Sequence, residues 1–345
     1  MIRRLQTVIR NLTKKNLDAF LVTSSPNIFY LTGYPSRDSW LLVSNKQTVF
    51  FTDGRYTQEA RKALAGSVRV LECRDSLARA VAEATAAGGI QRLGFEARHL
   101  TVAAQQALQK ERKALLWIPA DGLLEELRQI KTEEELVRIR EASRITLEAL
   151  RFAKSRLIPG IREIDLAAEL ECWIRLQGAQ ASAFDIIVAS GPHSSYPHHL
   201  TGRRIIRKND CVLIDMGVDY QGYKSDLTRV FFLGKIDILA QRIYRIILKA
   251  QEKALRAIRP GMQLKEIDRV AREYIATQGF GAAFSHGLGH GIGVEVHEAP
   301  KVSKKSEEKA IPGMVFTVEP GIYLPGKFGC RIEDMVLVTK KGCEV

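Results

Sequence analysis

The chain has 345 residues, more than one ordinary hydrophobic core holds, and this length predicts two domains. Apolar residues make up 46% and charged residues 26% of the chain, a composition that excludes a disordered protein. The formal net charge is +13, but the basic residues form no tail and accompany no recognition motif, so nucleic acid is not an expected partner.

The sequence also lacks a membrane span, a signal peptide and a disulfide-type cysteine pattern. No uncharged apolar run reaches the ~18 residues of a membrane span, and the charged segment 1–17 lacks the apolar stretch of a signal peptide. The cysteines are odd in number and widely spaced, at Cys73, Cys172, Cys211, Cys330 and Cys343. This pattern argues against a disulfide framework or a zinc finger, and we expect no membrane anchor and a reducing, cytoplasmic location.

The first part of the chain alternates strand-like and helical segments. Apolar runs bounded by turn residues predict strands at 18–24, 39–45, 48–53, 68–73 and 91–97. Segments 57–66 and 76–89 have the character of helices closed by glycine. The alternation indicates an α/β domain with a mostly parallel or mixed sheet, which we assign to residues 1–128.

A domain boundary is predicted near residue 129. Thr132 is followed three residues later by Glu135, which is a capping-box signature. Apolar residues then keep helical spacing as far as Leu157, and Pro159-Gly160 ends the helix. We therefore expect a long helix over 132–157 to open a second domain, residues 129–345.

The second domain contains an internal repeat. Three short segments recur after about a hundred residues: Pro159-Gly160 as Pro260-Gly261, Glu163-Ile164-Asp165 as Glu266-Ile267-Asp268, and 213–217 as 317–321. Chance similarity is the alternative explanation for such short matches. Their common order and nearly constant spacing favour a pseudo-twofold domain of two halves with one site at the seam.

Acidic residues in apolar surroundings predict a metal site. Asp215 and Glu319 each follow an apolar, strand-like run, and Asp226 and Glu333 stand in distinctive segments nearby. Burying several carboxylates together is costly unless a cation neutralises them. Four carboxylates with imidazole suit Mn²⁺, Co²⁺ or Fe²⁺, with Zn²⁺ as an alternative, and they exceed what one catalytic zinc needs. Two metal ions that share a hydroxide would use them all in hydrolysis.

Histidines supply the nitrogen ligands of this hypothesis, since six of the seven lie between residues 193 and 297. In segment 285–298, four glycines surround His286 and His290, so a regular helix is not expected there. His290 is the better ligand candidate, and His286 and His297 flank it as proton donors or substrate-binding groups. The alternative is that all three are structural histidines.

The motifs resemble those of a known family. Segments 190–199, 214–229, 286–298, 315–323 and 331–339 resemble the pita-bread dinuclear metallopeptidases, in particular the Xaa-Pro branch of prolidase and aminopeptidase P. Segments 27–34 and 50–60 resemble the creatinase-type N-terminal domain of that family. The resemblance implies an α/β creatinase-like domain over 1–128 and an α+β pita-bread catalytic domain, with pseudo-twofold symmetry, over 129–345.

The resemblance also implies a metal-ligand set. The matching positions are Asp215, Asp226, His290, Glu319 and Glu333. Asp226 and Glu333 are expected to bridge two divalent ions, with Asp215 on one ion and His290 and Glu319 on the other. The ions are expected to be Mn²⁺, with Co²⁺ or Zn²⁺ as alternatives.

Further site residues follow from the same resemblance. Glu319 is expected to be the general base as well as a ligand. His198, His286 and His297 are expected to bind substrate, stabilise the intermediate and transfer protons, and Arg331 to orient the site. His199 stands where many relatives have glycine, and it is either a wall residue or a chemical participant.

The function implied is that of a metal-dependent exopeptidase. It hydrolyses the Xaa-Pro bond at the N-terminus of peptides, as aminopeptidase P does, through a metal-bridged hydroxide. The alternatives are an Xaa-Pro dipeptidase (prolidase), another hydrolase on the same fold, and a non-catalytic binding module. The expected partners are a proline-containing peptide and a second copy in a homodimer. The sequence decides neither the peptide length nor the preferred first residue.

Overall fold

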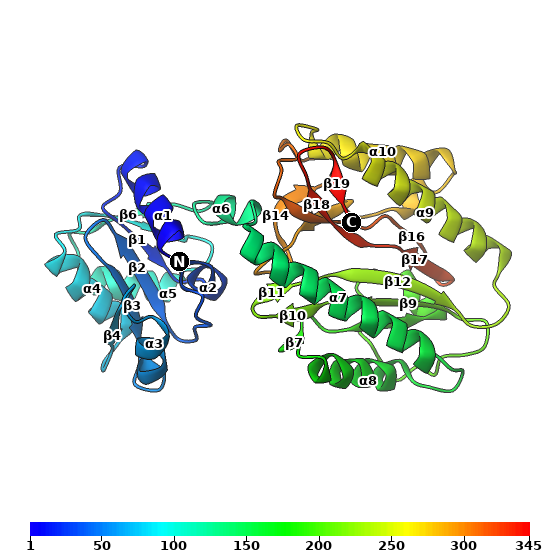
Figure 1. Cartoon of the computed structure of the whole chain (residues 1–345), viewed down its shortest axis with the longest axis horizontal. Helices are drawn as coiled ribbons and strands as arrows, with labels where there is room; N and C mark the ends of the chain where they lie inside the picture. The colour runs from blue at the N-terminus through cyan, green and yellow to red at the C-terminus, as the bar shows by residue number, and fades with distance from the viewer. The chain divides into compact units, whose positions relative to one another are not determined.

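The computed structural model describes all 345 residues, and they form two compact units, Met1–Arg128 and Gln129–Val345 (Figure 1). Each unit has its own sheets and helices. None of the helices combines the length and the apolar character that crossing a lipid bilayer requires.

The first unit is built on one six-stranded sheet. Its strands are β1 (Ala19–Val22), β2 (Trp40–Ser44), β3 (Thr48–Thr52), β4 (Arg69–Glu72), β5 (Arg92–Phe95) and β6 (Leu116–Pro119). The spatial order is β4-β3-β2-β1-β5-β6. The pairs β1–β2 and β2–β3 are antiparallel and the others parallel, so the expected mixed sheet is confirmed.

Six helices accompany this sheet: α1 (Ile2–Lys14), α2 (Ser25–Thr32), α3 (Thr57–Ala63), α4 (Leu77–Ala87), α5 (Val102–Glu111) and α6 (Glu125–Gln129). The sequence analysis predicted α3 and α4 but missed the others. Helix α1 shows why. Its buried face consists only of Leu5, Val8 and Leu12, which are spaced about one turn apart. Because the rest of the segment is largely polar, its overall composition gives little sign of an amphipathic helix.

The second unit opens with the long helix that its capping box predicts. Helix α7 (Glu133–Arg156) begins after Thr132, whose backbone N–H donates to Glu135 Oε2 at 2.9 Å while its hydroxyl accepts from the Glu135 N–H at 3.4 Å. Helix α8 (Glu163–Leu176) packs on α7. In the second half, α9 (Ile238–Ala257) and α10 (Leu264–Thr277) form the corresponding pair.

Each half of this unit carries a sheet beside its helix pair (Figure 1). The first half has β8 (Ile187–Ser190), β9 (Cys211–Met216) and β12 (Leu227–Phe232) in the order β12-β9-β8. The second half has β13 (Gly289–Gly291), β14 (Glu298–Val302), β15 (Val315–Val318), β18 (Asp334–Val338) and β19 (Cys343–Glu344) in the order β14-β13-β15-β18-β19.

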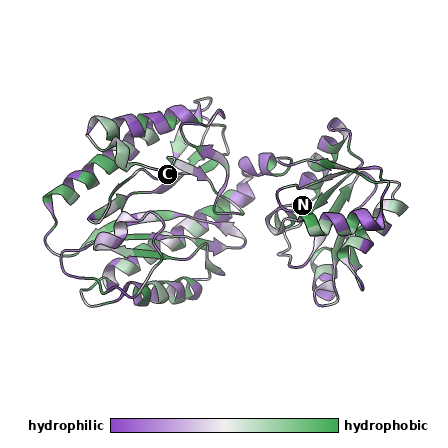
Figure 2. Cartoon of the chain, turned by 180° about the vertical axis from the view of Figure 1, so that it is seen from behind, coloured by the Kyte–Doolittle hydropathy of each residue, from purple (hydrophilic) through white to green (hydrophobic).

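Smaller elements complete the unit: strands β7 (Ala181–Ser182), β10 (Val218–Tyr220), β11 (Tyr223–Lys224), β16 (Gly321–Leu324) and β17 (Phe328–Arg331), and the 3₁₀ helices η1 (Gly191–Ser195) and η2 (Gly281–Ala283). The apolar residues of the two halves form two largely separate cores, one under α7 and α8 and one under α9 and α10. In Figure 2 the strands are largely hydrophobic, whereas the helices carry both hydrophobic and hydrophilic residues. This arrangement is the pseudo-twofold pita-bread fold.

A glycine at the end of β9 permits a close crossing of the chain near the seam. A Cβ atom added at Gly217 would lie 1.8 Å from the backbone oxygen of Ser225, well inside contact distance. The crossing brings the segment that contains Asp226 beside the end of β9, which contains Asp215. The backbone geometry of the seam therefore depends on the absence of a side chain at this position.

We predict that Gly217→Ala lowers the free energy of unfolding by about 1–3 kcal/mol, the usual range for inserting atoms into a packed region. Gly202→Ala is the matched control, because its nearest neighbouring atom would lie 3.7 Å away, and we expect it to stay within about 0.5 kcal/mol of the parent. Denaturant unfolding measures both variants. Equal stability of the two would contradict the close crossing.

Candidate active site

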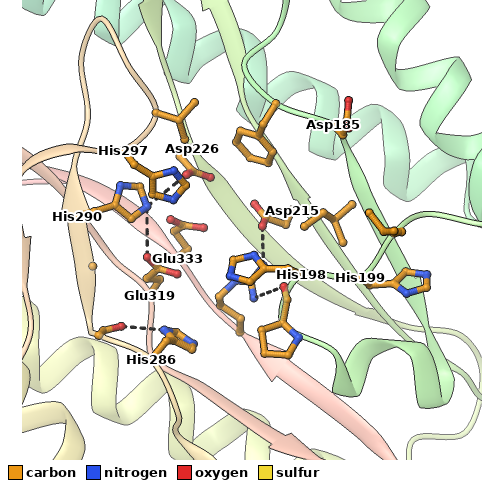
Figure 3. A pocket seen from close by; sticks show the side chains of 18 residues that line it. Asp185, His198, His199, Asp215, Asp226, His286, His290, His297, Glu319 and Glu333 are labelled. Atoms are coloured by element: carbon orange, nitrogen blue, oxygen red, sulfur yellow. Dashed lines mark hydrogen bonds and ion pairs between the residues drawn. The ribbon is translucent and has the colours of Figure 1, made fainter. Parts of the chain in front are cut away.

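The structure brings the five sequence-predicted ligands together in one pocket of the second unit. A cavity of about 460 Å³ is lined by Asp215, Asp226, His290, Glu319 and Glu333, together with the three histidines and the arginine singled out from the sequence: His198, His286, His297 and Arg331. His199 also lines it. Figure 3 shows Asp226, His290, Glu319 and Glu333 turned toward one another.

Strand register explains why the carboxylates meet. In the antiparallel pair β9–β12, Asp215 lies opposite Thr228, and Asp226 precedes Thr228 by two residues. Side chains two residues apart on an extended chain point to the same face. In the other half, β15 and β18 pair with Val318 opposite Asp334, so the residues just beyond each end, Glu319 and Glu333, are neighbours.

One backbone contact links the two carboxylate pairs. The N–H of Glu333 donates to the Thr228 carbonyl at 3.2 Å, so the strand ends of the two halves are held together at the seam. Ligand atoms of Asp226, His290 and Glu333 all lie within 4.8 Å of one another. Nε2 of His290 is 3.4 Å from Glu319 Oε1 and 3.6 Å from Asp226 Oδ2. Its Nδ1 donates to the Gly291 carbonyl at 3.2 Å, which leaves Nε2 to face the carboxylates.

The carboxylates cannot all carry a charge at neutral pH without a compensating cation. Burial raises the pKa of Asp226 and of Glu333 well above the ordinary range, and neighbouring carboxylates add to the rise. Burial also raises the pKa of Glu319 to about 7. Burial lowers the pKa of the adjacent His290 to about 4, so this imidazole is neutral and its nitrogen is available as a ligand.

Two carboxylate oxygens of the cluster lack a partner of the kind that a metal ion would supply. Asp215 Oδ1 and Glu333 Oε1 are buried and have no hydrogen-bond partner. The second oxygen of each group is held, Asp215 Oδ2 by Arg331 at 2.5 Å and Glu333 Oε2 by the Thr228 hydroxyl at 2.7 Å. A buried oxygen without a donor is costly. The donor set of four carboxylates and one neutral imidazole therefore fits divalent metal ions.

Arg331 joins the two halves through its side chain. It is buried, and its guanidinium donates to Asp215, to the Thr228 hydroxyl at 3.0 Å and to the Tyr323 hydroxyl at 2.8 Å. The sequence analysis missed Thr228 and Tyr323. Both lie inside segments that resemble the family, but a hydroxyl in a strand is no signal by itself. Burial raises the pKa of Tyr323 to about 12, so its hydroxyl stays protonated.

The predicted histidines differ in their surroundings. His286 donates from Nδ1 to the Gly287 carbonyl at 2.8 Å and accepts from the Tyr323 hydroxyl at Nε2 over 3.0 Å, and burial lowers its pKa to about 4. His297 and His198 are instead exposed in the pocket, and the His297 ring centroid lies 4.2 Å from that of His290. These two are therefore the histidines that remain free to meet a ligand.

His199 lies apart from the carboxylates. Figure 3 shows it on the other wall of the pocket, with its ring turned away from them. Its Nε2 is 3.1 Å from Glu163 Oε2. Glu163 was noted in the sequence only as part of the internal repeat, and nothing in its local pattern indicates that it reaches a pocket residue 36 positions away.

Comparisons with known proteins give the family of the chain. Residues 137–340 match metallopeptidase family M24, and residues 4–130 match the creatinase/prolidase N-terminal domain. The uncharacterized peptidase YqhT of Bacillus subtilis (strain 168) is 39% identical over 97% of this chain and 95% of its own length. A Pyrococcus horikoshii protein named Xaa-Pro dipeptidase is 35% identical over 99% of this chain and 96% of its own.

Solved structures show the same likeness over the whole chain. The Xaa-Pro dipeptidase from Bacillus anthracis has a TM-score of 0.95 and 38% identity, covering 100% of this chain and 96% of that one. The X-Pro aminopeptidase from Thermotoga maritima MSB8 has a TM-score of 0.91 and 33% identity, covering 99% and 96%. The chain thus belongs to metallopeptidase family M24, with a creatinase/prolidase N-terminal domain in front of a pita-bread domain that binds divalent metal.

Proposed function

We propose that the chain is a metal-dependent exopeptidase that hydrolyses Xaa-Pro dipeptides. Release of an N-terminal residue from longer peptides, which the sequence analysis placed first, becomes the second candidate. The observation that carries the proposal is the buried carboxylate cluster, with two unpartnered oxygens, in the same pocket as two exposed histidines. Similarity over nearly the full length to proteins named Xaa-Pro dipeptidase supports the shorter substrate, and similarity to an X-Pro aminopeptidase keeps the second candidate.

We propose that the cluster holds two divalent ions, with Mn²⁺ as the first choice. Asp226 and Glu333, both buried, would be the ligands shared by the two ions. Asp215 would complete one side, and His290 and Glu319 the other, in keeping with the contacts of His290 to Asp226 and Glu319. When bound, such ions lower the pKa of water and polarise the scissile carbonyl.

The chain's own residues supply the remaining chemistry. The carboxylate of Glu319 takes the proton of the attacking water. His198 and His297, exposed in the pocket, interact with the carbonyl oxygen as negative charge develops and return a proton to the proline nitrogen. His286 is neutral and hydrogen-bonded to Tyr323, so its role is to orient the Tyr323–Arg331 pair. Arg331 in turn orients Asp215.

A homodimer and a cytoplasmic location are further parts of this proposal. The homodimer rests on the family resemblance. The location rests on the odd number and wide spacing of the cysteines in the sequence. Neither enters the chemistry of the pocket described above.

We predict that Asp226→Ala abolishes turnover and lowers the metal content, because the loss of a bridging carboxylate leaves both ions short of a ligand. Metal analysis after gel filtration, together with a peptidase assay, measures this. Asp185→Ala is the matched control, since Asp185 is an exposed aspartate on the wall of the same pocket. Two ions and near-normal activity in Asp226→Ala would remove Asp226 from the site.

We predict that His297→Ala retains its metal but lowers kcat by roughly 10²–10⁴-fold, the usual contribution of a proton-transfer group. The reason is that His297 is exposed in the pocket beside His290 and makes no contact with the carboxylates as close as those of His290. His99→Ala, an exposed histidine of the first unit, is the control. Loss of metal in step with activity would make His297 a ligand.

We predict that Ala-Pro is hydrolysed with a kcat/KM at least ~100-fold above that of Ala-Ala. Proline's nitrogen carries no N–H in the peptide bond, whereas an alanine in a pocket shaped for the ring buries an unpaired N–H at a cost of about 1–3 kcal/mol and loses about 0.8 kcal/mol for each unburied methylene. Assays with Mn²⁺ on both dipeptides measure the ratio. Equal values would refute proline specificity but leave the hydrolase.

The peptide-length series separates the two candidate functions. For a dipeptidase we expect Ala-Pro-Ala and longer peptides to be cleaved at least ~10-fold more slowly than Ala-Pro, because the pocket has to accommodate the free carboxylate directly after proline. Comparable or faster cleavage of the longer peptides would instead identify an aminopeptidase. The metal and the protein concentration are kept constant across the series.

A further inference from the structure

A second group of metal-ligand side chains lies on the wall of the pocket opposite the carboxylates. It consists of Glu163 at the start of α8, His193 in η1 and His199, and we name it the Glu163 cluster. The Glu163 side chain is fully buried, that of His199 is 10% exposed and that of His193 is 35% exposed. The cluster is therefore a buried carboxylate below two imidazoles, the outer of which meets solvent.

Both imidazoles direct a ring nitrogen at the same carboxylate oxygen. His193 Nδ1 and His199 Nε2 each lie 3.1 Å from the same oxygen, Glu163 Oε2. The three residues' ligand atoms all lie within 4.8 Å of one another, and the two rings pack with their centroids 4.5 Å apart. In a tetrahedral zinc site with bonds of about 2.0–2.1 Å, neighbouring ligand atoms are separated by about 3.3 Å. Two of the three separations between ligand atoms, those from Glu163 Oε2 to the two histidine nitrogens, are already close to this length.

The two oxygens of Glu163 have different sets of partners, and Oε2 is contacted by the two histidines. Its other oxygen, Oε1, accepts from the Ser190 N–H at 2.8 Å and from the Ser190 hydroxyl at 2.6 Å, and His193 Nδ1 also lies 3.2 Å from it. Arg204 contacts the same hydroxyl and is itself paired with Asp210 at 2.6 Å, so the pair adds no net charge. Metal-binding carboxylates are commonly oriented by such outer hydrogen bonds.

The two imidazoles can present unprotonated nitrogens to a metal ion. A neutral imidazole carries its proton on either nitrogen. Metal binding therefore requires the tautomers of His193 and His199 in which the proton is on the nitrogen that faces away from Glu163.

We propose that Glu163 Oε2, His193 Nδ1 and His199 Nε2 bind one divalent ion, Zn²⁺ by preference, at a site separate from the five-ligand cluster. Two imidazoles and one carboxylate form a mixed nitrogen and oxygen set that suits zinc, whereas the carboxylate-rich cluster suits harder ions. Three protein ligands leave a fourth position for water or a substrate group. Because His199 also lines the active-site pocket, zinc would place a positive charge on that wall.

The test counts zinc ions in the full-length protein. Each variant is equilibrated with Zn²⁺ and a competing chelator of known affinity, separated by gel filtration and analysed for zinc per chain. We expect His193→Ala to bind one zinc fewer than the parent chain at the same free zinc, with the affinity of that site lowered by roughly 100-fold or more, since outer-shell changes alone cost 10–100-fold. His99→Ala, an exposed histidine far from both clusters in sequence, is the control and should bind as the parent does.

A second variant keeps the test valid if His193→Ala does not fold, which circular dichroism reports. His199→Asn removes another ligand, and we expect the same loss of one zinc. Identical zinc counts and affinities in the parent and in each folded variant would overturn the proposal and leave the cluster as a hydrogen-bonded group. The result is independent of the five-ligand cluster, because failure of that cluster changes the total zinc count of every protein but not the difference between parent and variant.

Discussion

The mutual repulsion of buried carboxylates is the constraint on which this structure depends. Asp226 and Glu333 are buried side by side, and burial together with their neighbours raises the pKa of both well above the ordinary range. Such a group is destabilising for the apoprotein and becomes favourable only with cations. A fold that keeps four carboxylates together in this way therefore indicates that its native form is the metal-bound protein.

A scaffold of polar contacts holds these carboxylates in place. Arg331 contacts Asp215, Thr228 and Tyr323, and Thr228 contacts Glu333, so one connected network spans both halves of the second unit. The contacts to Asp215 and Glu333 each use a single carboxylate oxygen and leave the other buried without a hydrogen-bond partner. The network thus orients ligands without competing for the atoms that bind metal.

In both halves an acidic side chain of the second helix accepts a hydrogen bond from the backbone of a neighbouring loop. In the first half, Glu163 on α8 accepts the Ser190 N–H at the end of β8; in the second half, Asp268 on α10 accepts the Leu288 N–H just before β13, at 3.0 Å. In each case an acidic residue of the second helix fixes a loop that enters the pocket. The halves then diverge, because Asp268 is paired with Arg272 whereas Glu163 faces two histidines. In the repeat Glu163 matches Glu266 and not Asp268. The two halves therefore make similar loop contacts from different positions, and the partner of each acid sets the local chemistry.

Local patterns in the sequence predicted the two domains, the internal repeat and the proposed metal ligands. These depend on local features: a capping box at Thr132, apolar runs that end in Asp215 and Glu319, and glycines around His290. The contacts of Tyr323 with Arg331 and of Glu163 with His199 are apparent only in the folded chain. Those contacts join residues that are ordinary in their own segments, and they arise from helix packing and hairpin register, which no local pattern encodes.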